Sequence, residues 1–64
     1  MLNEIIDLIG DRDAHFVLAV GSNNDWIAFI EQDERPDELL CWGVSDKPEE
    51  AINFMLANGL TRAA

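Results

Sequence analysis

Three side chains near the start of the chain have the types and spacing of metal ligands. Asp11, Asp13 and His15 alternate, so an extended segment places all three on one side. Carboxylate and imidazole groups there suit a divalent cation. In a calcium loop beginning at Asp11, however, the sixth position is Phe16 instead of Gly and the twelfth is Ser22 instead of Glu, which excludes an EF-hand. We predict no metal site and no other bound cofactor.

Groups suited to nucleophilic catalysis are equally sparse. His15 is the only histidine and Cys41 the only cysteine, and a nucleophile needs a base and an orienting group that the sequence does not single out. A strand cysteine between Leu40 and Trp42 is typical of small core filler. The four glycines are scattered and form no phosphate-binding loop. We therefore predict that the protein is not an enzyme.

Charge is the most informative property of the sequence. Thirteen acidic residues face four basic ones in 64 residues, giving a formal net charge of −9. The basic residues Arg12, Arg35, Lys47 and Arg62 are spread along the chain, whereas phosphate binding needs a basic cluster. We expect no direct binding to nucleic acid and a preference for a basic partner protein.

The acidic residues are concentrated in the connections between predicted elements. Asp46, Glu49 and Glu50 are explained by a helix start, where the helix dipole favours negative charge. The remaining excess predicts an anionic partner-binding patch, with Phe29 and Trp42 as apolar anchors; the alternative is that the acidity serves only solubility. The acidic members of this predicted site are Asp11, Asp13, Asp25, Glu31, Asp33, Glu34, Asp37 and Glu38.

Size and composition indicate a single small domain, residues 1–64. Apolar residues make up 48% of the chain, too many for a disordered acidic tail. One cysteine allows no internal disulfide, and no cluster of cysteine and histidine offers a structural zinc site. We therefore expect oligomerisation or docking to a partner protein to stabilise this small domain. Without a leader pattern or a membrane-spanning run, we expect a cytoplasmic protein that does not bind membranes.

The hydrophobic pattern predicts an α+β fold of order α-β-β-β-α. Leu2, Ile5, Ile6 and Ile9 form a helical stripe that Gly10 ends. Three β-rich segments follow at 15–20, 26–31 and 38–44, and predict an antiparallel meander. A second helix is expected to begin with Asp46 as N-cap, Glu49 completing a capping box and Pro48 in the first turn, and to end at Asn58-Gly59. We expect two helices packed on one face of a three-stranded antiparallel sheet, with residues 61–64 frayed.

Alternation along the strands places large apolar groups on both faces of this sheet. Whichever face the helices cover, several of Ile27, Phe29, Leu40 and Trp42 are candidates for the open side. There they would mark an interface, and a homodimer would satisfy the same pattern. The alternative is that helices and loops bury them within one chain.

The sequence has two resemblances to known domain families. The segments 26–31 (WIAFIE) and 43–52 (GVSDKPEEAI) resemble the strand and helix entry of HicB-type antitoxin domains, but the Pro-x-Leu-Pro-Gly segment of that family is missing. The α-β-β-β-α order is also that of double-stranded RNA-binding domains, yet Glu49 and Glu50 stand where those domains carry lysines. The first resemblance implies an antitoxin that binds a small toxin.

In size, acidity and lack of catalytic groups, the whole chain is similar to small phage-encoded anti-CRISPR proteins, several of which act as DNA mimics. This resemblance implies a non-enzymatic inhibitor in the host cytoplasm that blocks target DNA binding by a CRISPR effector complex. We take as the leading hypothesis an acidic inhibitor of a basic, nucleic-acid-handling protein. The alternatives are a HicB-like antitoxin and a homodimeric structural module.

Overall fold

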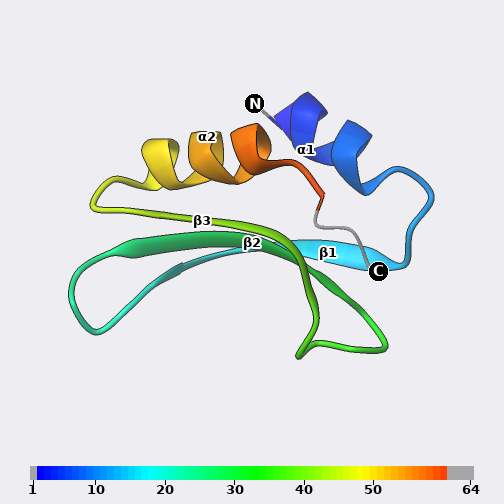
Figure 1. Ribbon diagram of the computed structural model, residues 1–64, viewed down its shortest axis with the longest axis horizontal. Helices are drawn as coiled ribbons and strands as arrows, with labels where there is room; N and C mark the ends of the chain where they lie inside the picture. The colour runs from blue at the N-terminus through cyan, green and yellow to red at the C-terminus, as the bar shows by residue number, and fades with distance from the viewer. Residues whose placement is uncertain (1, 61–64) are drawn as a thin grey trace.

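The chain folds into one antiparallel sheet with both helices on the same face (Figure 1). The computed structural model describes residues 2–60, so the predicted fraying of 61–64 lies outside the described residues. The elements are α1 (Leu2–Ile9), β1 (Ala14–Val20), β2 (Trp26–Gln32), β3 (Leu39–Ser45) and α2 (Pro48–Asn58). The predicted α+β fold class and the order α-β-β-β-α are confirmed.

The sheet is a meander in which β2 lies between β1 and β3. Val17 of β1, Phe29 of β2 and Trp42 of β3 form one cross-strand row. The register shifts between Ile30 and Glu31, where β3 contains a bulge. A bulge adds one residue to one strand and disturbs the alternation of its side chains.

The core lies between α2 and the sheet. Ala28, Ile30 and Cys41 of the sheet pack against Ala51 and Met55 of α2, and all five are fully buried. Ile5 and Ile52 complete this cluster. No charged or polar side chain of the described residues is buried, so the interior is uniformly apolar and its stability rests on close packing.

Gly43 allows α2 to approach β3 closely. A methyl group built at this position overlaps the carbonyl oxygen of Ala51 and the backbone nitrogen of Met55, and lies 2.9 Å from Cβ of Phe54. Carbon atoms normally meet at about 3.5–4.0 Å, so only glycine fits without moving the helix. The cross-strand neighbour of Gly43 is Ala28, another small residue under the same helix.

Both helices end at the glycines expected from the sequence, but the start of α2 differs from the prediction. Gly10 and Gly59 both have positive φ values, 59° and 66°, and their N–H groups donate to Ile6 and Met55 carbonyl oxygens. At the other end of α2 the N-cap is Lys47, with no side-chain cap hydrogen bond. The predicted capping box of Asp46 and Glu49 is therefore wrong, because the helix begins one residue later, at Pro48.

Candidate protein-interaction surface

Two connections that are distant in the sequence meet at one end of the sheet. The α1–β1 connection and the β2–β3 connection both lie on the right in Figure 1. The Asp33 N–H donates to the Asp13 carbonyl oxygen at 2.9 Å and joins them. They border a depression of about 330 Å³ lined by Asp11, Arg12, Asp13, Gln32 and Glu34.

Seven of the eight predicted acidic site residues belong to this end of the sheet, which we call the acidic end. Its members are Asp11, Asp13, Glu31, Asp33, Glu34, Asp37 and Glu38. Against seven carboxylates stand the guanidinium groups of Arg12 and Arg35, which leaves a formal charge of −5 while His15 is neutral. The fold therefore concentrates charge that the sequence spreads over residues 11–38.

The two arginines of this region make only long, exposed contacts. The Arg12 guanidinium donates to the carbonyl oxygens of Leu8 and Ile9 at 3.5 and 3.4 Å, where a cation complements the C-terminal end of the α1 dipole. Arg35 forms an exposed ion pair with Glu38 at 3.5 Å. Pairs of this kind contribute about 0–1 kcal/mol because water screens them. With two cations against seven carboxylates, the acidic end has a net negative charge.

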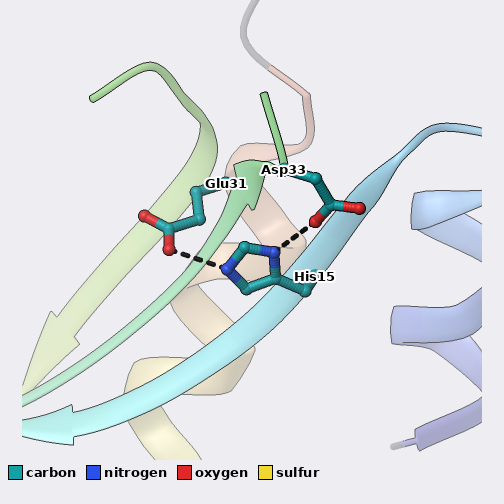
Figure 2. A network of polar contacts seen from close by, with 3 residues as sticks. All are labelled: His15, Glu31 and Asp33. Atoms are coloured by element: carbon teal, nitrogen blue, oxygen red, sulfur yellow. Dashed lines mark hydrogen bonds and ion pairs between the residues drawn. The ribbon is translucent and has the colours of Figure 1, made fainter. Parts of the chain in front are cut away.

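His15 lies between two carboxylates at the border of the acidic end (Figure 2). Its Nδ1 is 2.5 Å from Asp33 Oδ1 and its Nε2 is 2.7 Å from Glu31 Oε1. Hydrogen bonds to Asp33 and to Glu31, in that order of effect, raise the pKa of His15 above its ordinary value of 6.5. Ionised carboxylates only accept hydrogen bonds, so both contacts are satisfied when the imidazole is protonated. His15 faces Glu31 and Asp33, not the Asp11–Asp13 metal arrangement that its spacing suggested.

The sheet face opposite the helices is apolar, and no element of the described chain covers it (Figure 1). Two cross-strand rows lie next to the row of His15 and Glu31. Trp42 is 49% exposed and Val44 40% exposed. We call the six side chains of these rows the open face: Val17, Ala19, Ile27, Phe29, Trp42 and Val44.

Two predicted residues lie elsewhere than the sequence pattern suggested. Asp25 is in the β1–β2 connection, at the opposite end of a seven-residue strand and about 20 Å from the acidic end. Successive connections of an antiparallel meander alternate between its two ends, so the predicted topology already contained this signal. Leu40 packs against the core instead of joining the open face, because the bulge interrupts the alternation.

Cys41 has the structural role that the sequence indicated. Its side chain is fully buried in the core, and burial raises the pKa of its thiol. A raised thiol pKa lowers the fraction of the side chain that is present as thiolate, which is the nucleophilic form. Within residues 2–60, no group of three or more histidine, cysteine or carboxylate side chains is arranged to hold a metal ion.

Comparisons with known proteins give no relative for this chain: no family model matches it, and neither a curated protein nor a solved structure is detectably similar. Of the helices in the described part of the chain, none has the length and apolar character to cross a membrane.

Proposed function

We propose that this protein is a non-catalytic inhibitor that binds a basic, nucleic-acid-binding surface of a partner protein. The observation that carries the proposal is the position of seven acidic residues, from two connections and the end of β2, at one end of the sheet together with only two arginines. In this role the carboxylates of the acidic end occupy the positions of phosphate groups. They compete with nucleic acid for the same lysine and arginine side chains.

Electrostatics favours this function on two grounds. A concentrated field of one sign raises the rate of association with a surface of the opposite sign. Clustered carboxylates also repel each other and destabilise the folded chain at distances below about 8 Å, so a binding partner that neutralises them relieves this repulsion. The resemblance to anti-CRISPR proteins suggests one partner class, the subunits of a CRISPR effector complex that hold target DNA.

The test is capture of the partner by charge-matched variants. The full-length chain is immobilised, exposed to lysate of the cells in which it is made, and eluted with salt from about 0.05 to about 0.5 M, a range over which screening becomes strong. We expect the captured protein to bind nucleic acid, to leave at moderate salt, and to release its nucleic acid when the free chain is added.

Two triple variants separate the acidic end from net charge. The first replaces Asp11, Glu34 and Asp37 by lysine; all three side chains are exposed. The control also introduces three lysines, in place of Asp7, Asp46 and Glu49, which are likewise exposed but lie outside the acidic end. Both gain the same charge. We expect the first to lose capture and the second to keep it, and equal loss in both would contradict the proposal.

A further inference from the structure

The open face has the composition of a docking surface. None of its six side chains carries a charge, and Phe29 and Trp42 stand side by side in neighbouring strands. Paired aromatic side chains near the centre of a surface are the residues that contribute most to protein binding. Exposed apolar surface of this kind on a small domain indicates contact with another molecule.

Charge at the borders of the open face decides what that molecule is. Glu31 and Asp33 lie at one end of the strands, and Asp25 belongs to a connection at the other. A second copy of the chain would bring carboxylates against carboxylates in either strand direction. A partner with basic side chains flanking an apolar centre meets opposite charge at both ends.

The dimensions of the face fit one helix. Three strands about 4.8 Å apart and seven residues long give a surface about 10 Å wide between the outer strands and about 20 Å long. An α-helix with side chains is about 10–12 Å across and spans 20 Å in about 13 residues. On the covered face, the 11-residue helix α2 already lies on β2 and β3.

Building on the function proposed above, we infer that the open face binds a single amphipathic helix of the partner protein. The apolar stripe of this helix packs on Phe29 and Trp42, and its lysine or arginine side chains lie over Glu31 and Asp33. The acidic end then holds the adjoining basic surface of the same partner. Two contacts of different chemistry, one apolar and one electrostatic, fix the orientation of the complex.

The experiment uses two synthetic peptides of about 15 residues. Both consist of the same leucine, alanine and lysine residues; one has its leucines in a helical stripe, and in the other the order is scrambled. Binding is measured by calorimetry with wild type, Trp42→Ala and the matched variant Val20→Ala. Val20 is 55% exposed on the helix side of the sheet, so its loss does not touch the open face.

We expect the striped peptide to bind wild type at least about tenfold more tightly than the scrambled one, and Trp42→Ala to lose about tenfold or more. Val20→Ala stays within about twofold of wild type. On the unaltered protein, nuclear magnetic resonance should show shifts of the Val17, Ile27 and Val44 methyl groups on adding the striped peptide. This readout does not depend on the folding of any variant.

Three results overturn the inference. Equal binding of the two peptides shows that only charge is recognised. Methyl shifts confined to the helix side place the docking surface there. Self-association of wild type that Trp42→Ala abolishes assigns the open face to a second copy. None of these removes capture by the acidic end, so the inference can fail while the proposed function stands.

Discussion

Gly43 offers a sharp test of the packing that holds α2 on the sheet. We predict that Gly43→Ala destabilises the protein, although alanine normally restricts the unfolded chain and stabilises the native one when its side chain fits. The added methyl group overlaps backbone atoms of Ala51 and Met55. Backbone atoms of a helix cannot rotate away as a side chain can, so the whole helix must move.

The size of the effect follows from this geometry. Overpacking a close-packed core costs about 1–3 kcal/mol, and contact with backbone atoms places Gly43→Ala at about 2–3 kcal/mol. A domain of this length has about 3–10 kcal/mol of total stability, so the variant loses a large fraction of it. For small domains this corresponds to a decrease in Tm of about 10–20 °C.

The assay is thermal and urea unfolding followed by circular dichroism, with Gly21→Ala as the matched control. A methyl group at Gly21 meets only ordinary contacts, at 3.5 Å from the Asp25 carbonyl oxygen and 3.6 Å from Ile27 Cδ1. We expect Gly21→Ala to stay within about 0.5 kcal/mol of wild type or to be slightly more stable. An unchanged Tm in Gly43→Ala would refute the close approach of α2 to β3.

Three further predictions concern single side chains. The one histidine signal in nuclear magnetic resonance should titrate with a pKa above 6.5. Because folding raises this pKa, the stabilisation of the folded state by His15 should be complete below pH 6.5 and disappear as pH rises through the raised value. A pKa at or below 6.5 would contradict the two hydrogen bonds between the imidazole and the carboxylates of Asp33 and Glu31. Ile5→Ala should lower the free energy of unfolding in urea by about 2–5 kcal/mol, because Ile5 is 3% exposed. The control Ile6→Ala, at a position 63% exposed, should lower it by about 0.5 kcal/mol or less. Equal losses in the two variants would show that α1 does not pack on the core through Ile5. Asn58→Ala should lower the free energy of unfolding by about 1 kcal/mol in the same assay, since the Asn58 amide donates to the Trp42 carbonyl oxygen at 2.8 Å. An unchanged free energy of unfolding would show that this hydrogen bond between α2 and β3 does not stabilise the fold.

Much of the fold could be predicted because its signals are local. The stripe of α1 and the positive-φ glycines at 10 and 59 mark helix limits through short-range physics. Alternation separates Ala28 and Ile30 from Phe29, on opposite faces of the sheet, as the structure shows; that the helices cover the face of Ala28 and Ile30 came only from the structure. Each of these features depends on residues within a few positions of one another.

Features that depend on packing between distant segments were less accessible. The bulge that turns Leu40 toward the core is a property of how β2 and β3 pair. The need for Gly43 arises only when α2 lies on it. The start of α2 differs by one residue: the N-cap position is occupied by Lys47, which makes no side-chain cap hydrogen bond, whereas sequence rules assume that a good N-cap residue is used where one is present.

The candidate site divides in the same way. The acidic residues of the β2–β3 connection are neighbours in sequence, so their proximity needed no structure. Their association with Asp11 and Asp13 depends on the hydrogen bond between the Asp33 N–H and the Asp13 carbonyl oxygen. The position of His15 between two carboxylates depends on its cross-strand pairing with Glu31, and the register of that pairing is set by the whole sheet.

The most direct test of the central claim is the salt dependence of partner binding by the acidic end. The affinity for the captured partner is measured at several salt concentrations for wild type and for the triple lysine variant of Asp11, Glu34 and Asp37. We predict a steep loss of affinity with salt in wild type, and weak binding with a much shallower dependence in the variant. A wild-type affinity that does not change with salt would contradict the account.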